Sequence, residues 1–226
     1  MRSNALSWNP MEAFNFTVAN EDQNCYTFDM RKLGSALKVH TDHLGAVFVI
    51  FFSSLGFFVL LIFENASLDI DYSPTGQEFV TGSYDKTIRI FSIHSKGSRE
   101  VYHTSRMQRI FASRFSADAN YVFSASEDTN VRIWKAKSSR PIGILNPRQK
   151  QSLEYQEKLK ERYKDVPEIR RIAKHKHLPR PLKVARDQKR AHDQSLFRKE
   201  RNRVEASKGK LKMQLVKKKA IVDHAS

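Results

Sequence analysis

Short segments in which β-branched or aromatic residues alternate with polar ones recur through the first 139 residues. Turns rich in Ser, Pro, Gly and Asp bound each segment, which is the pattern of half-buried β-strands. Beyond this part the pattern becomes helical: "QKQSLEYQEKLKERYKDV" predicts a helix ended by Pro167, and "LKVARDQKRAHDQSLFRKERNRVEASKG" predicts a nearly all-polar helix ending near Gly209. The sequence therefore predicts an all-β part followed by an α-helical part.

Three windows of the all-β part share one pattern: "FTVANEDQNCYTFD", "FVTGSYDKTIRIFS" and "FSASEDTNVRIWK". Aligned on an aspartate, each window carries an aromatic residue six positions later. The three pairs are Asp22 and Phe28, Asp85 and Phe91, and Asp128 and Trp134. The second and third aspartates are 43 residues apart. A period in the low forties that ends in "[I/V]-R-I-[W/F]" resembles the WD repeat, which builds four-stranded propeller blades.

Five residues are expected to have structural roles in these repeats: His43, Asp85, Phe91, Asp128 and Trp134. The two aspartates are expected to hold the turn before the last strand of the repeat rather than to act in catalysis. His43 with Asp85 resembles part of a blade's internal hydrogen-bond network, and Arg106 occupies the histidine position of the next blade.

An insertion interrupts the repeat. Asp22 and Asp85 are 63 residues apart, twenty more than the spacing of 43. The interval contains the uncharged run "AVFVIFFSSLGFFVLLIF", residues 46–63. Eighteen residues of helix rise about 27 Å, so a membrane-spanning helix fits by length. Lys and Arg precede the run but do not follow it until Lys86, which would place the N-terminus in the cytoplasm.

Two other interpretations of the run compete with the membrane span. One is an extra buried segment packed on the propeller, although insertions normally lie in polar surface loops. The other is a segment that is not native to the fold, such as a retained intron of about twenty codons. The repeat continues on both sides as though the run were absent, so the register favours the last interpretation.

Charge divides the chain in the same place as the structural pattern. Residues 1–139 hold 14 Lys and Arg against 14 Asp and Glu, whereas residues 140–226 hold 26 against 10, and thus the entire net charge of +16. Such segregation indicates a polyanionic partner, above all nucleic acid, with a solvated basic tail as the alternative. The densest basic segment is bracketed by prolines expected to hold its backbone extended. Its candidate RNA-contacting residues are Arg170, Arg171, Lys174, His175, Lys176, His177 and Arg180.

That basic segment has other interpretations, namely a nuclear import signal or a helix packed on a ribosomal protein. His175 and His177 lack the carboxylate or thiolate neighbours of a metal site. Cys25 is the only cysteine, which excludes a disulfide framework and fits a reducing compartment. No Gly-rich phosphate loop, acid–base pair or nucleophile motif is present. We expect no catalytic residue, cofactor or metal.

The order of these parts resembles a known family. Blades ending directly in "YQEKLKERYKDVPEIRRIAKHKHLPRPL" and then "RKERNRVEASKG" are similar to the C-terminus of the WD-repeat and Sof-domain proteins, the suppressor-of-fibrillarin family. "SWNPMEAFNFTVANEDQNCYTFDMR" and "DYSPTGQEFVTGSYDKTIRIF" resemble that family's last blades, so the resemblance covers roughly residues 1–45 and 68–210. A full member has about seven blades, so the resemblance implies a C-terminal fragment or truncated form with an incomplete ring.

The resemblance also implies a function. It implies a non-catalytic scaffold of the nucleolar small-subunit processome, which matures pre-ribosomal RNA with the fibrillarin-containing small nucleolar RNP. The family further resembles DDB- and cullin-associated substrate receptors of ubiquitin ligases. The shared box would be residues 16–31, with Phe28-Asp29-Met30-Arg31 standing where Trp-Asp-x-Arg is usual. Its candidate residues are Asp22, Phe28, Asp29 and Arg31. A third alternative is a membrane-anchored fragment, which applies only if the apolar run is native.

The predicted architecture is therefore three propeller blades, a basic helical domain and one apolar insertion. The expected boundaries are a blade at 1–45, the insertion at 46–67, two blades at 68–139, a basic Sof-like helical domain at 140–210 and a basic tail at 211–226. The expected location is the nucleus and nucleolus, with the membrane as the alternative.

Overall fold

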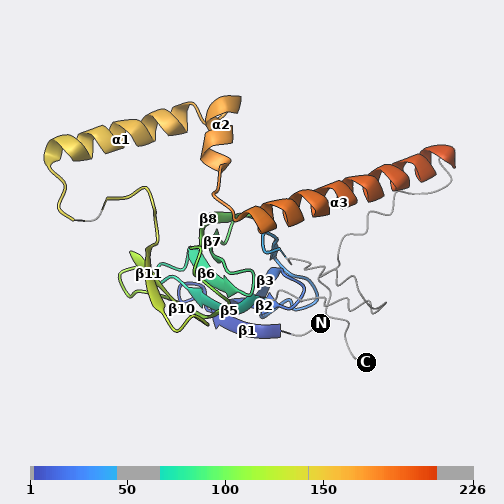
Figure 1. Cartoon of the computed structure of the whole chain (residues 1–226), viewed down its shortest axis with the longest axis horizontal. Coiled ribbons are helices and arrows are strands. Elements are labelled where there is room, and N and C mark those ends of the chain that lie inside the picture. Colours follow the sequence, from blue (N-terminus) through green and yellow to red (C-terminus); the bar gives the residue numbers. More distant parts are fainter. Residues whose placement is uncertain (1–2, 45–66, 142, 208–226) are drawn as a thin grey trace, which may run out of the picture. The chain divides into compact units, whose positions relative to one another are not determined.

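The computed structural model describes residues 3–44, 67–141 and 143–207 of the 226-residue chain. The chain divides into two compact units. The first unit, residues 1–136 with 178–226, contains all the described strands and helix α3 (Arg180–Ala206), and the second, residues 137–177, contains helices α1 (Pro147–Arg162) and α2 (Pro167–Lys174) (Figure 1).

The described strands form three antiparallel sheets in chain order, which confirms the three predicted blades. Each blade is a meander in which consecutive strands pair as neighbours. Blade 1 contains β1 (Ser3–Trp8), β2 (Asn15–Asn20), β3 (Cys25–Asp29) and β4 (Lys38–His40). Blade 2 contains β5 (Ser67–Tyr72), β6 (Glu78–Ser83), β7 (Ile88–Ser92) and β8 (Ser98–Tyr102). Blade 3 contains β9 (Ile110–Phe115), β10 (Tyr121–Ser126) and β11 (Val131–Lys135).

The turn that follows each repeated aspartate has the same backbone geometry in all three blades. Gln23, Lys86 and Thr129, each directly after its aspartate, have φ angles of 70°, 61° and 64°. These lie in the left-handed region that residues other than glycine seldom adopt. The repeat therefore specifies the turn through the aspartate and not through a glycine.

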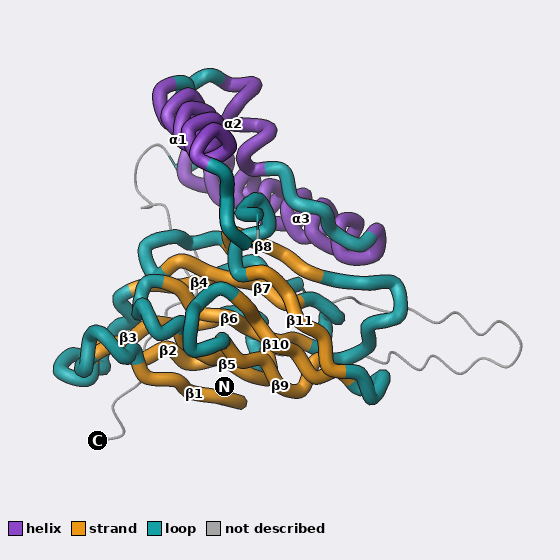
Figure 2. The backbone as a smooth tube through the Cα atoms, turned by 90° about the vertical axis from the view of Figure 1, so that its left-hand side faces the viewer, coloured by secondary structure: helices purple, strands orange, loops and turns teal. Residues whose placement is uncertain are grey.

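The first strands of the blades lie side by side, because β5 contacts both β1 and β9 (Figure 2). Between blades 1 and 2, Ala19 and Cys25 pack against four blade-2 residues: Ile70, Tyr72, Phe79 and Phe91. Between blades 2 and 3, the core contains Val80, Ile88 and Ile90 from blade 2 with Met107, Ile110, Val122 and Ala136. Blade 2 thus uses opposite sheet faces toward its two neighbours, as strand alternation dictates.

The outer faces of the two end blades remain uncovered by any other described strand. Leu6 and Trp8 of blade 1 are 52% and 48% exposed, and Val131 and Ile133 of blade 3 are 69% and 64% exposed. Three blades therefore form an arc with two apolar ends, as expected for an incomplete ring.

The helical part differs from the prediction most clearly at Pro167. Pro167 was expected to end a helix and to begin an extended segment, but it is the first residue of α2. Proline suits this position because the first N–H of a helix needs no intrahelical acceptor. Only the stretch from His175 to Pro179 is extended. The extended prediction for residues 167–174 was therefore wrong.

The apolar run at 46–63 lies outside the described residues, as does the rest of the predicted insertion at 46–67 except Ser67, which is the first residue of β5. Within the part of the chain that the structure does describe, no helix is both long and apolar enough to cross a membrane.

Candidate functional site

The carboxylate of Asp85 organises the interior of blade 2. His43 Nδ1 lies 3.0 Å from Asp85 Oδ2, and His43 Nε2 lies 2.7 Å from Thr81 Oγ1. Asp85 Oδ1 accepts hydrogen bonds from the backbone N–H and the hydroxyl of Thr87, at 3.0 and 2.6 Å. Arg89 Nη2 lies 3.6 Å from Asp85 Oδ2. Burial raises the pKa of Asp85, but these neighbours outweigh it and lower that pKa to about 2.

Asp85, His43 and Thr81 follow one another in the order of a catalytic triad. All three side chains are buried, with Thr81 and the Asp85 side chain 0% exposed. The Thr81 hydroxyl also lies 3.4 Å from the backbone carbonyl oxygen of Arg89. A hydroxyl enclosed in this way has no path to a substrate, so the arrangement supports a structural role for the three residues.

The equivalent aspartate of blade 3 lies nearer the surface. Both carboxylate oxygens of Asp128 pair with the guanidinium of Arg132, and the two side chains are 13% and 18% exposed. Trp134 donates from its indole N–H to Ser124 Oγ at 2.9 Å. In blade 2 the ring of Phe91 stacks on Phe79 instead, with centroids 5.3 Å apart. The aspartate and the aromatic residue of the repeat therefore stabilise blades 2 and 3 through different contacts.

Sequence reasoning missed a chain of hydrogen bonds that joins blades 1 and 2. Tyr72 Oη lies 2.5 Å from Thr17 Oγ1, which lies 2.9 Å from Thr27 Oγ1, which lies 3.1 Å from His40 Nε2. His40 Nδ1 lies 2.7 Å from the carbonyl oxygen of Ser95. That carbonyl can only accept, so Nδ1 carries the proton and Nε2 accepts from Thr27. No signal in the sequence could have found this chain, because its members are spread over 79 positions of the sequence.

The candidate adaptor box ends in a surface ion pair. Arg31 donates to Asp29 from Nε at 3.0 Å and from Nη2 at 2.8 Å, and the Arg31 side chain is 64% exposed. These hydrogen bonds lower the pKa of Asp29 to about 2. The ring of Phe28 stacks on Phe16 within blade 1, with centroids 5.8 Å apart. A bidentate pair holds the guanidinium in a fixed orientation at the surface.

Asp22 lies at the opposite end of β3 from this ion pair, in the turn between β2 and β3. There it accepts hydrogen bonds from the backbone and side-chain N–H of Asn24, both at 3.1 Å, and from the hydroxyl of Tyr26. Burial and this hydrogen bond raise the pKa of Tyr26 to about 12. The structure therefore brings Asp29 and Arg31 together, whereas Phe28 packs on Phe16 and Asp22 holds a separate turn.

The candidate RNA-contacting residues lie on α2 and in the segment that follows it. Arg170, Arg171 and Lys174 are exposed and share one side of α2, while the apolar Ile169 and Ile172 share the other. None of these three cations forms an ion pair with a described residue. His175 and His177 are also exposed, and Lys176 is partly buried. Arg180 is the first residue of α3 and belongs to the other unit.

Within the described residues, no group of three or more His, Cys, Asp or Glu side chains could hold a metal ion. The sequence-predicted binding residues thus fall mainly at two exposed places in the described part of the chain: the Asp29–Arg31 ion pair on blade 1, and α2 with the segment after it.

Comparison with known families matches both parts of the chain. The WD domain, G-beta repeat, matches residues 64–92 and 100–135, which include β5 to β7, β9 to β11 and part of β8. The Sof1-like domain matches residues 136–221, which include all three helices. Blade 1 lies outside both matches, although its sheet has the same strand order as blade 2.

Several curated proteins are similar to the chain over most of its length. Protein SOF1 of Saccharomyces cerevisiae is 46% identical over 202 residues, 89% of this chain and 37% of that protein. DDB1- and CUL4-associated factor 13 of Xenopus laevis is 50% identical over 182 residues, 80% of this chain and 36% of that protein. The human protein of the same name is 44% identical over 223 residues, 98% of this chain and 46% of that protein.

The chain spans less than half the length of these curated relatives. Its blades and its helical part nevertheless match in the order that the sequence predicts. The chain belongs to the family of WD-repeat proteins with a Sof1-like domain, which includes protein SOF1 and DDB1- and CUL4-associated factor 13.

Proposed function

We propose that the chain is a non-catalytic scaffold in ribosome biogenesis that takes part in maturing small-subunit pre-rRNA within the nucleolar processome. Its partners there are pre-rRNA, the fibrillarin-containing small nucleolar RNP and processome proteins. The similarity to protein SOF1 supports a role in ribosome biogenesis. We propose the RNA contact because the cations on one side of α2 form no ion pair with a described residue. This helix lies inside the region that matches the Sof1-like domain.

The chemistry of α2 fits a phosphate backbone. Three cations on one side of a two-turn helix, followed by Lys176, can each neutralise a phosphate. Such contacts carry little sequence information, because bases are read through their edges and not through phosphates. We therefore expect structured RNAs to bind with similar affinity and with a steep dependence on salt.

The test is filter binding of the whole chain to structured RNA across a salt series. Replacing Arg170, Arg171, Lys174 and Lys176 with Gln should weaken binding and lower the salt slope by roughly 3, since each phosphate contact contributes about 0.7. A control replaces four exposed lysines outside α2 and the segment that follows it, namely Lys32, Lys86, Lys96 and Lys137. A slope that changes equally in both variants would refute a site on α2. Recovery of small nucleolar RNA with the tagged chain tests the processome assignment.

A second function, that of a substrate receptor for a cullin-based ubiquitin ligase, is favoured by the Asp29–Arg31 pair. Relatives of the chain are named as DDB1- and CUL4-associated factors, and this pair lies where their box would end. We expect Arg31→Ala to reduce recovery of DDB1 and to leave processome association intact. Arg114→Ala is the matched control, because Arg114 is 61% exposed and also pairs with a carboxylate, that of Asp71. Loss of both associations in Arg31→Ala would indicate an unfolded blade instead.

A further inference from the structure

The first three strands of each blade align one apolar residue each on a single face of the sheet. In blades 2 and 3 these residues belong to the cores that join each blade to the one before it, so we call this face the leading face. Its aligned residues are Trp8, Phe16 and Phe28 in blade 1, Tyr72, Phe79 and Phe91 in blade 2, and Phe115, Val122 and Trp134 in blade 3. All three blades thus have an apolar leading face.

The opposite face of each sheet, which we call the trailing face, is aligned in the same regular way. Its aligned residues are Thr17, Cys25 and Thr27 in blade 1, Val80, Ile88 and Ile90 in blade 2, and Phe123, Val131 and Ile133 in blade 3. In blades 1 and 2 this face meets the following blade, and all six residues are at most 1% exposed. Phe123, Val131 and Ile133 are instead 38%, 69% and 64% exposed. Blade 3 therefore has an apolar trailing face that no other described strand covers.

Blade 1 has the complementary exposed face. On its leading face, Leu6 and Trp8 of β1 are 52% and 48% exposed. The equivalent residues of β5, Ile70 and Tyr72, lie in the core shared with blade 1 and are only 1% and 5% exposed. The leading face of blade 1 and the trailing face of blade 3 are therefore the two halves of one blade–blade contact.

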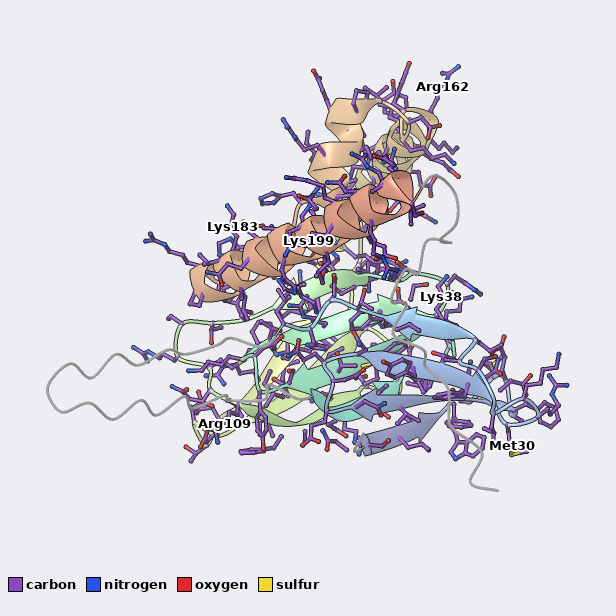
Figure 3. All side chains as sticks on the ribbon, turned by 90° about the vertical axis from the view of Figure 1, so that its right-hand side faces the viewer. Met30, Lys38, Arg109, Arg162, Lys183 and Lys199 are labelled. Atoms are coloured by element: carbon purple, nitrogen blue, oxygen red, sulfur yellow. The ribbon has the colours of Figure 1, made fainter. Side chains whose placement is uncertain are left out.

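These two halves lie at opposite ends of the arc. Blade 2 lies between the end blades, because β5 contacts both β1 and β9. Figure 3 shows Met30 of blade 1 and Arg109, directly before β9, on opposite sides of the three sheets. One chain therefore cannot join its own two exposed faces while blade 2 keeps its contacts with both neighbours. A second copy of the chain supplies both missing halves at once.

We propose that two copies of the chain pair into a closed ring, in which blade 3 of each copy packs its trailing face on the leading face of blade 1 of the other. Twice the three sheets of one chain gives six blades, and closed propellers have about four to eight. The ring has a two-fold axis, which is the commonest symmetry of soluble oligomers. The pairing goes beyond the RNA contact proposed for α2 and does not depend on it.

Burial of apolar surface favours the pair over the monomer. Soluble monomers seldom expose a large contiguous apolar face, and such a face marks an interaction site. Each pair forms two identical contacts, so the apolar residues of four exposed faces leave water together. Once the first contact has formed, the second pair of faces is held close, and its contact forms at a high effective concentration.

The experiment is sedimentation equilibrium of the whole chain, for which we expect a mass twice that of one chain. Leu6→Asp and Ile133→Lys should each raise the dissociation constant of the pair about a hundredfold or more, because each buries an unpaired charge in both contacts. Leu196→Asp and Ile172→Lys are matched controls on the helices, where Leu196 and Ile172 are 49% and 74% exposed. The controls should pair like the unmodified chain, and circular dichroism checks that each variant keeps its strands.

Mixing the two variants tests the ring arrangement directly. A mixed pair of Leu6→Asp and Ile133→Lys has one contact without any substitution, and its other contact carries both substitutions, which have opposite charges. The mixture should therefore pair at least about tenfold more tightly than either variant alone.

Four results would overturn the proposal. A monomeric unmodified chain at about 100 μM would leave both faces to the blades of another or a longer polypeptide. Loss of pairing in only one of the two variants would indicate a contact between like blades. A mass above that of a pair would indicate an open chain of copies. Equal losses in the matched controls would place the contact outside the two faces.

Discussion

Replacing Asp85 with Asn tests whether the buried ion group holds blade 2 together. The substitution keeps the shape of the side chain and one oxygen that can accept from Thr87. It removes the negative charge that faces Arg89, which is 2% exposed, and places an N–H group or a weaker acceptor opposite His43 Nδ1. Among the described residues, Arg89 would then keep Asp42, at 3.7 Å, as its one carboxylate partner.

The expected cost follows from the burial of both charges. Removing one partner of a buried ion pair leaves the other charge desolvated, which costs about 3–5 kcal/mol. A domain of ordinary stability unfolds with about 5–15 kcal/mol, so this loss is a large fraction of the total. Surface ion pairs are worth much less, because water screens them. Asp128→Asn in blade 3, where the Asp128 and Arg132 side chains are 13% and 18% exposed, should therefore cost less.

The assay is urea unfolding of the whole chain, followed by circular dichroism and by the fluorescence of Trp8 and Trp134. Asp85→Asn should lower the unfolding midpoint well below that of Asp128→Asn. We reason that burial of the aspartate, and not its position in the repeat, determines how much it stabilises the blade. Equal midpoints for the two variants, or a smaller loss for Asp85→Asn, would refute this.

Three further predictions concern stability. Burial lowers the pKa of His40 to about 4 from its usual 6.5, so the unfolded chain takes up a proton first as pH falls. The free energy of unfolding should therefore fall by about 3 kcal/mol between pH 6.5 and pH 4. Urea titrations over this pH range should find a smaller fall in His40→Gln. Thr129→Gly should stabilise blade 3 by about 1 kcal/mol in the same assay, because a β-branched residue is strained at φ 64°. Deleting residues 47–66 should leave the unfolding midpoint unchanged or higher. Sequencing of the transcript across this junction should find that the main form lacks the segment. A lowered midpoint would contradict the idea that the segment is foreign to the fold.

The blades could be predicted from the sequence because a repeat supplies its own comparison. The aspartate-to-aromatic spacing located the turns, and the alternation in "TIRIF" and "NVRIW" located the strands that became β7 and β11. The helix boundaries were less accurate. Proline stops a helix and also starts one, and nothing in "DVPEIRRIAK" alone decides between the two for Pro167.

The sites could be predicted only in part, for a physical reason. The Asp29–Arg31 pair is two residues apart and so falls within one motif. Phe14 joins this pair through a contact across strands, and the chain from Tyr72 to Ser95 joins two blades. Such contacts depend on the register of strands distant in sequence, which a single sequence does not specify. The apolar residues in the loops of blade 1 are visible in the sequence. Only the structure shows that their side chains are exposed and not part of the hydrophobic core.

The strand register also bears on the origin of the insertion. β5 and β9 each contain six residues, and both end in an aromatic residue, Tyr72 and Phe115. Before β9 the chain runs from the buried Met107 through two residues to the start of the strand. The equivalent buried residue before β5 is Leu44, and 22 residues separate it from Ser67. The difference of twenty equals the excess between Asp22 and Asp85, although it is measured from strand ends and not from the motif. His43, before this gap, contacts Asp85 and Thr81, after it, so the two parts of the repeat meet in blade 2 as the spacing without the twenty residues predicts.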